Sequence, residues 1–490
     1  MLQVILIYLA FVPLVYSTHG CDPPIVNTEC GKVQGIYKNG AYSFRGIPYA
    51  VPPTGSKRWT RALPLSHKTS TCWNKTYQAT NFGHTCIQRN PDNISQIIGS
   101  EDCLFLNVWT PSLSPGLLPV MVWIHGGSLQ FSNGNWPTYS PDEQLASDTN
   151  IVYVSMNYRL HAFGFMALDI LSNSSPTGTS GNYGFMDQVL ALQWVQRNIR
   201  NFGGDPNKVT VFGQSSGGTS IFALLAAPEV AGLFHRAWLM STSPVLNKTT
   251  PEAAKDNEIF LQNTGCSTIT CLHNLEAEKV INSVPWDVYP YWAMRDQGDL
   301  PVKGVFDGAI AVVDGDLIPE APFDAWKSGK GIDVPLLIGS TAQEIDFFPT
   351  QMDLNLWNWT LYEQRVRQKL GTFGRQISDE ALRLYPTGEV TPEYQYTSMA
   401  SDLRVSCAND ILADIASSHY KSPVFRYVVT SRPSHPIHVV EIPFPASYSC
   451  HMWDIFGFFG TIKDYYTPEP ERQYVRRCYE GRDSFLRENG

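Results

Sequence analysis

The sequence predicts an α/β fold in which helices flank a mostly parallel central sheet. Short runs rich in valine and isoleucine are typical of strands covered on both faces, and the helix-like stretches between them favour parallel pairing. The 490 residues contain no repeat, low-complexity tract or linker, so we expect one large domain with surface insertions. The predicted strands are PVMVWIHG (119–126), IVYVSMNYR (151–159), KVTVFG (208–213), VPLLIGS (334–340) and PVFRYVVT (423–430).

The chain begins with an apolar stretch of signal-peptide length. Residues 1–20, MLQVILIYLAFVPLVYSTHG, end in small and polar residues before Cys21, which is typical of a cleaved secretory signal. A membrane anchor fits less well, because Pro13 interrupts an apolar part that is too short to span a bilayer. No later segment resembles a membrane span, and the end, FLRENG, is neither a retrieval signal nor a lipid-anchor tail. We therefore expect a protein that is secreted or held in the secretory-pathway lumen, with no membrane anchor.

Cysteines, sequons and charge agree with an extracellular setting. Ten cysteines, an even number, suit an oxidising compartment, although they are too scattered for a small disulfide scaffold. In a secreted chain, N-x-[ST] sequons are candidate surface glycosylation sites. The net charge of −9, with no long basic run, argues against nucleic-acid binding. The sequon asparagines are Asn74, Asn93, Asn173, Asn247 and Asn358.

A glycine-rich loop follows the first predicted strand. Residues 122–128, VWIHGGS, resemble the HGGG-type loop of esterases and lipases. An acyl-transfer site needs backbone N–H groups aimed at an oxyanion, and such a loop supplies them. The helix expected at 187–199, DQVLALQWVQRNI, has Leu190 and Trp194 among its buried-face candidates.

Ser215 lies where the strand KVTVFG gives way to a helix, SGGTSIFALLAA. A nucleophile elbow places its serine at such a strand-to-helix turn. The flanking glycines fit a strained turn that packs closely, and the N–H dipoles of the helix start point at developing negative charge. The pattern therefore predicts a nucleophile at Ser215.

A nucleophilic serine needs a histidine held by an acid, and in α/β-hydrolases these follow the serine in the order acid, then histidine. The loop after 334–340, TAQEIDFF, offers Glu344 and Asp346. Beyond 423–430 lie His435, His438 and His451. Position along the chain leaves two acids and three histidines open.

With these residues placed, the chain is similar to the type-B carboxylesterase and cholinesterase-like family of α/β-hydrolases. The similarity covers about residues 24 to 480 of the expected mature domain, 21–490. It rests on FRGIPYAVPP (44–53), SEDCLFLNVWTP (100–111), VMVWIHGGS (120–128), GNYGFMDQVLALQWVQRNIRNFGGDPNKVTVFGQSSGG (181–218) and HMWDIFGFFG (451–460).

The resemblance implies a catalytic triad of Ser215 as nucleophile, Glu344 as acid and His451 as base. It implies an oxyanion hole formed by the N–H groups of Gly127, Ser128 and Ser216, and it implies no metal or organic cofactor. Disulfides Cys86–Cys103 and Cys266–Cys271 are also implied by the resemblance. It assigns no partner to Cys21, Cys30, Cys72, Cys407, Cys450 or Cys478.

Three departures from the family pattern bear on activity. Ser128 replaces a common third glycine, and a positive φ there would cost serine about 1 to 3 kcal/mol. The loop from Cys86 to Cys103 has no tryptophan, whereas cholinesterases place their choline-binding tryptophan there, so acetylcholine is not the expected substrate. The sequence stops at ENG, before the family's tryptophan-containing closing segment, so we expect a chain shortened at its C-terminus.

The sequence thus favours a secreted serine carboxylic-ester hydrolase of broad specificity, acting on small-molecule esters through an acyl-enzyme. A narrower alternative is a juvenile-hormone-esterase-like enzyme, because the G-Q-S-x-G spelling of the elbow is similar to that group's. A non-catalytic cholinesterase-like adhesion or recognition protein is the alternative of a different class. The aromatic segment 285–296 is too weak a lid candidate to favour an interfacial lipase.

Overall fold

The computed structural model describes residues 23–91, 93–114, 116–285, 299–304, 310–346, 356–437 and 445–465. The predicted signal peptide, Cys21, His438, Cys478 and nearly all of the aromatic segment 285–296 lie outside the described residues.

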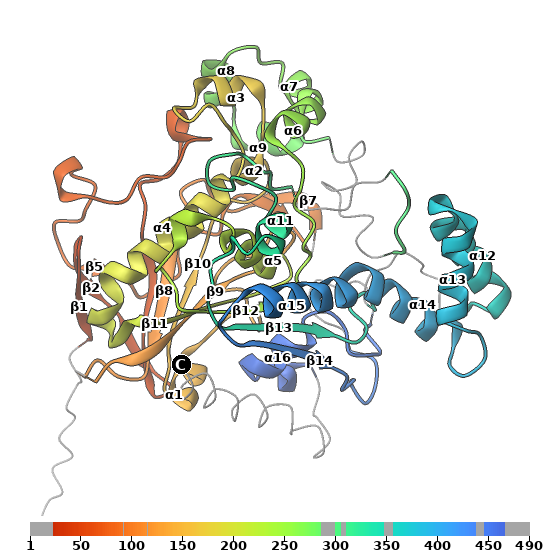
Figure 1. Ribbon diagram of the computed structural model, residues 1–490. Coiled ribbons are helices and arrows are strands. Elements are labelled where there is room, and N and C mark those ends of the chain that lie inside the picture. The colour runs from red at the N-terminus through yellow and green to blue at the C-terminus, as the bar shows by residue number, and fades with distance from the viewer. Residues whose placement is uncertain are drawn as a thin grey trace, which may run out of the picture.

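A nine-stranded mixed sheet forms the centre of the molecule (Figure 1). Strands β9 to β14 are joined by parallel pairings, whereas β3, β4 and β8 add to the edge beside β10 by antiparallel pairing. All five predicted strands are confirmed. The sheet order is β14 (Val424–Val429), β13 (Leu336–Thr341), β12 (Arg236–Met240), β11 (Gly204–Gln214), β9 (Leu118–Ile124), β10 (Val152–Met156), β8 (Phe105–Thr110), β4 (Ala41–Pro48) and β3 (Ile36–Lys38).

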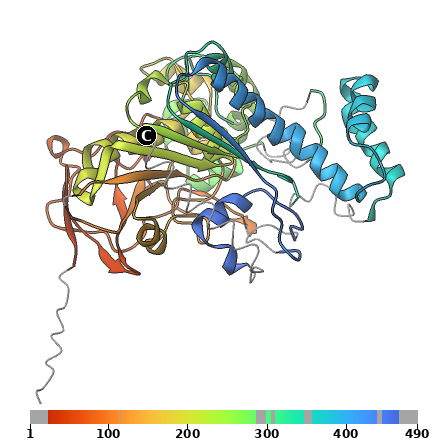
Figure 2. The same cartoon turned by 60° about the horizontal axis from the view of Figure 1, so that its bottom comes forward.

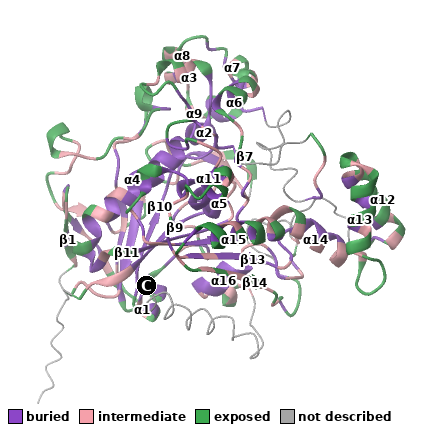
Figure 3. Ribbon diagram, in the orientation of Figure 1, coloured by how far each residue is buried: buried purple, intermediate pink, exposed green. Residues whose placement is uncertain are grey.

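Helices cover both faces of this sheet because its strands are apolar on both sides. In β9, Val120, Val122 and Ile124 join a cluster that contains residues of α4 (Tyr183–Asn198) and α5 (Ser216–Leu224). The alternating residues Met121 and Trp123 join a second cluster with α1 (Glu143–Thr149) and α16 (Trp453–Phe459). Figure 3 shows the buried residues concentrated on these central strands.

Smaller elements surround the sheet. Helices α12, α13 and α14 share a separate hydrophobic cluster with Leu300, Ile345 and Trp357, and Figures 1 and 2 show α12 and α13 projecting beyond α14. The remaining strands are β1 (Ile25–Thr28), β2 (Gly31–Gln34), β5 (Tyr77–Gln78), β6 (Gln88–Asn90) and β7 (Asn93–Ile98). The remaining helices are α2 (His161–Phe165), α3 (Asp169–Ser174), α6 (Thr250–Asp256), α7 (Glu258–Thr264), α8 (Ile269–His273), α9 (Ala277–Asn282), α11 (Pro322–Lys327), α12 (Trp359–Leu370), α13 (Arg375–Leu384), α14 (Pro392–Ser401) and α15 (Cys407–His419).

Three disulfides lie within the described residues. Cys86 is joined to Cys103 and Cys266 to Cys271, the two pairs that the family resemblance implies. The third, Cys30–Cys72, joins cysteines 42 positions apart, a pairing that the sequence left unassigned. Cys407 is an exposed free thiol and Cys450 a buried one.

All five sequon asparagines lie on the surface, each with an exposed side chain. Asn358 is also the N-cap of α12, where its Oδ1 accepts a hydrogen bond from the Leu361 N–H at 3.0 Å. Among the helices that the structure describes, none is long and apolar enough to cross a bilayer.

Candidate active site

The turn from β11 into α5 presents Ser215 in a strained backbone conformation. Ser215 has φ 59° and ψ −126°, which few non-glycine residues adopt, and its N–H donates to the Met240 carbonyl at 2.8 Å. A Cβ at Gly217 would lie 2.1 Å from the Ile124 carbonyl oxygen, and one at Gly213 would lie 2.6 Å from the Gly217 carbonyl carbon. Because backbone surrounds both glycines, no larger residue fits at either position, as the elbow interpretation requires.

The glycine-rich loop after β9 packs against this turn. Gly127 and Ser128 have φ values of 99° and 54°, so serine does occupy the positive-φ backbone at this position. The Leu129 N–H donates to the Ser216 Oγ at 3.0 Å, which ties the loop to the start of α5. The Gly127 N–H donates no hydrogen bond within the described chain, and the Ser216 N–H lies in the first turn of α5, where helix N–H groups have no intrahelical acceptor. The loop and the helix start therefore lie together beside Ser215, at the place where the sequence predicts the oxyanion donors.

Glu344 and His451 come together from the loops that follow β13 and β14. Glu344 is 1% exposed, and its Oε2 lies 2.5 Å from the His451 Nδ1. Its other oxygen accepts hydrogen bonds of 2.7 Å from the Thr341 N–H and from the Ser241 hydroxyl. The carboxylate is thus fixed in place and directed at the imidazole.

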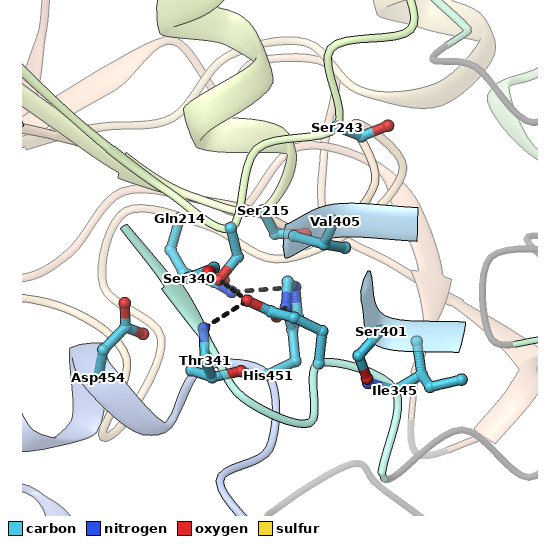
Figure 4. Close-up of polar contacts among 12 residues, drawn as sticks. Gln214, Ser215, Ser243, Ser340, Thr341, Ile345, Ser401, Val405, His451 and Asp454 are labelled. Atoms are coloured by element: carbon cyan, nitrogen blue, oxygen red, sulfur yellow. Dashed lines mark hydrogen bonds and ion pairs between the residues drawn. The ribbon is translucent and has the colours of Figure 1, made fainter. Parts of the chain in front are cut away.

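Gln214 contacts the second ring nitrogen of the same histidine. The Gln214 amide nitrogen lies 2.9 Å from the His451 Nε2, and Figure 4 shows this contact beside Ser215. The Tyr139 hydroxyl donates to the Gln214 Oε1 at 2.5 Å. Sequence reasoning used Gln214 only for the spelling of the motif and did not identify Tyr139, which lies 75 residues away from it.

The other candidate acid and histidines have different surroundings. Asp346 accepts hydrogen bonds from the N–H groups of Ser447 and Tyr448 at 2.6 and 2.8 Å, and burial raises its pKa to about 6. His435 is exposed, and its Nδ1 lies 3.3 Å from the Ser434 hydroxyl. Of the predicted acids and histidines that the structure describes, Glu344 and His451 are the pair in contact.

A further buried carboxylate lies three residues after His451. Asp454 accepts a hydrogen bond from the Tyr427 hydroxyl at 2.7 Å, and burial together with the nearby Glu344 charge raises its pKa to about 6. It was not predicted, because a single aspartate in an apolar helix gives no signal of its own. Burial also lowers the pKa of His125, in the glycine-rich loop, to about 4, so its imidazole is neutral at pH 7. Within the described ranges no cluster of three or more His, Cys, Asp or Glu side chains could hold a metal ion.

Comparisons with known proteins agree with this architecture. The sequence model of the carboxylesterase family matches residues 22–487. The chain is 33% identical over 435 residues to para-nitrobenzyl esterase of Bacillus subtilis, covering 86% of this chain and 82% of that protein. It is 34% identical over 391 residues to neurotactin of Drosophila melanogaster, covering 78% of this chain but only 44% of that protein. The solved Geobacillus stearothermophilus carboxylesterase superposes with a TM-score of 0.76 at 28% identity, over 95% of this chain and 91% of the other.

Proposed function

The chain belongs to the carboxylesterase family, and on that premise we propose that it is a secreted serine carboxylic-ester hydrolase of broad specificity. The observation that carries the proposal is the site at the ends of the parallel strands. A strained serine, the partly exposed His451 with its buried partner Glu344, and a glycine-rich loop come together there. These are the nucleophile, base, orienting acid and oxyanion donors of acyl transfer.

In the proposed mechanism, His451 removes the proton from Ser215 as the hydroxyl attacks the ester carbonyl. Glu344 orients the imidazole and stabilises its protonated form. The N–H groups of Gly127, Ser128 and Ser216 hold the tetrahedral oxyanion. His451 then protonates the departing alcohol, and water, deprotonated by the same imidazole, releases the acid from the acyl-enzyme.

Hydrolysis of a short-chain nitrophenyl ester by the purified protein, measured beside Ser215→Ala, tests this function. Turnover that disappears in the variant supports it, and a series of acyl chains then measures how broad the specificity is. The G-Q-S-x-G elbow makes a juvenile-hormone ester the informative additional substrate. Equal inertness of two folded proteins would favour the recognition alternative, for which Ser128 in the oxyanion loop is the one supporting observation.

Secretion and glycosylation are proposals that one expression experiment checks. The five exposed sequons lead us to expect a protein in the culture medium that is heavier than its sequence. Treatment with an N-glycosidase should increase its electrophoretic mobility, and replacing all five asparagines by glutamine should abolish that shift. Retention of an unmodified chain inside the cell would contradict both proposals.

Replacing Ser128 by glycine separates backbone strain from catalysis. Glycine relieves the strain of serine at φ 54° but loses more backbone entropy on folding, so the two effects partly cancel, and we expect the free energy of unfolding to rise by about 1 kcal/mol. Both residues supply an N–H, so kcat/KM should change by less than about tenfold. Ser70→Gly is the matched control, since Ser70 is exposed at φ 55° and should show a similar gain in stability with no change in activity. If an inert wild type became active as Ser128→Gly, the serine would be what disables the site.

A further inference from the structure

We propose that Gln214 is a positioning residue that keeps the Nε2 atom of His451 unprotonated and thereby sets the low-pH limit of activity. The inference rests on the proposed esterase function and concerns the same site. Gln214 is the last residue of β11, directly before Ser215, and its side chain is fully buried. The hydrogen bonds of its amide are therefore made to protein groups rather than to bulk water.

The structure places the two ends of the Gln214 amide against different partners. The Tyr139 hydroxyl donates to the Gln214 Oε1, and the amide nitrogen faces His451. An amide N–H only donates, so the His451 Nε2 must accept with a lone pair. The ring proton then lies on Nδ1, which faces the Glu344 carboxylate. This is the tautomer that a general base needs in order to accept the proton of Ser215.

Packing holds Tyr139 in the position that this network requires. Its ring packs edge to face against Trp123, with a centroid separation of 5.3 Å, and lies 6.5 Å from the ring of Phe456. A Cβ at Gly126 would lie only 2.6 Å from the Tyr139 hydroxyl oxygen. The first glycine of the loop is thus the residue that leaves room for the Tyr139–Gln214 hydrogen bond.

In this amide orientation, Gln214 opposes a second proton on the His451 ring. A doubly protonated imidazole would direct its Nε2–H at the amide N–H, so that two donors would face each other. The titratable groups around it are Glu344 and Asp346 after β13, Cys450 beside it, and Asp454 on α16 with its partner Tyr427 on β14. Gln214 is uncharged and keeps the lone pair of the His451 Nε2 free of a proton. When substrate binds, the Ser215 hydroxyl replaces the Gln214 amide as the donor to this nitrogen.

Gln214→Glu tests the proposal with nearly unchanged shape. A glutamate beside Nε2 shares a proton with it, and whichever group holds that proton, the lone pair is occupied. We expect the acid limb of kcat/KM for the nitrophenyl ester to move upward by about one pH unit or more, with activity recovered at high pH. Gln262→Glu, which adds the same charge at an exposed position of α7, should leave the profile unchanged.

Two further measurements keep the inference separate from the proposed function. Tyr139→Phe removes the hydroxyl that contacts the Gln214 Oε1, so it should move the acid limb of kcat/KM in the same direction. If Gln214→Glu fails to fold, this second variant tests the role of Gln214 in its place. NMR of 15N-labelled histidine, with His451 identified from His451→Gln, should show an unprotonated Nε2 in the wild type whether or not esters are hydrolysed. Superimposable pH profiles for the wild type and the folded variants, or a protonated Nε2 in the wild type, would overturn the proposal. If wild type and Ser215→Ala are equally inert, the esterase function fails, and the NMR result still decides the role of Gln214.

Discussion

Replacing Ser215 by alanine is expected to reduce kcat/KM for a short nitrophenyl ester by about four to six orders of magnitude. Alanine leaves the elbow backbone in place but removes the only atom proposed to bond to the acyl carbon. The residual rate then comes from substrate binding and the oxyanion donors acting on water. Steady-state kinetics of both purified proteins give the ratio, and circular dichroism with a thermal melt shows whether both are folded.

Ser243→Ala is the control for this measurement. Ser243 lies on the loop beyond β12 (Figure 4), and its N–H donates to the Thr219 Oγ1 at 3.2 Å. Because its hydroxyl has no proposed role, kcat/KM should change by less than about tenfold. Equal rates for the wild type and Ser215→Ala would show that hydrolysis occurs without this elbow.

The strand-and-helix framework was predictable because each element carries its own signal in the sequence. Continuous apolar runs indicated β9, β10, β11, β13 and β14, and the glycines around Ser215 indicated the turn. Strand β12, Arg236–Met240, was missed because RAWLM is short and contains no valine or isoleucine. The antiparallel edge strands β3, β4 and β8 were not predicted either, because their pairing depends on contacts between segments distant in the sequence. Strand β8 pairs with β10 and β4 pairs with β8, so these strands extend the sheet beyond β10.

The site was only partly predictable, because contacts between loops decide which acid lies against which histidine. Chain order reduced the acid to Glu344 or Asp346, and the family resemblance chose Glu344. The reason that the two acids differ is not local, because one faces His451 and the other binds the backbone at 447 and 448. The Tyr139–Gln214 hydrogen bond and the Cys30–Cys72 disulfide likewise join segments whose sequences give no indication of the pairing.

Glu344→Gln is expected to lower kcat/KM by about four orders of magnitude, because it reverses the tautomer of His451. The Thr341 N–H and the Ser241 hydroxyl both donate to one oxygen of Glu344. A glutamine keeps its carbonyl oxygen toward those donors, so its NH₂ group faces the His451 Nδ1. That nitrogen then accepts, the ring proton moves to Nε2, and the base has no lone pair for the proton of Ser215.

Asp346→Asn is the matched control, since it makes the same acid-to-amide change two residues away on the same loop. Asp346 accepts hydrogen bonds from the backbone N–H groups of residues 447 and 448 and does not contact the imidazole. Weakening these bonds should lower the melting temperature of the protein and reduce kcat/KM by less than about tenfold. Steady-state kinetics and melting temperatures for both variants make the comparison. If Asp346→Asn lost as much activity as Glu344→Gln, the choice between the two acids would be wrong. A large loss confined to Glu344→Gln would instead identify the tautomer of His451 as the property that this carboxylate controls, the same property that Gln214 holds from the opposite nitrogen.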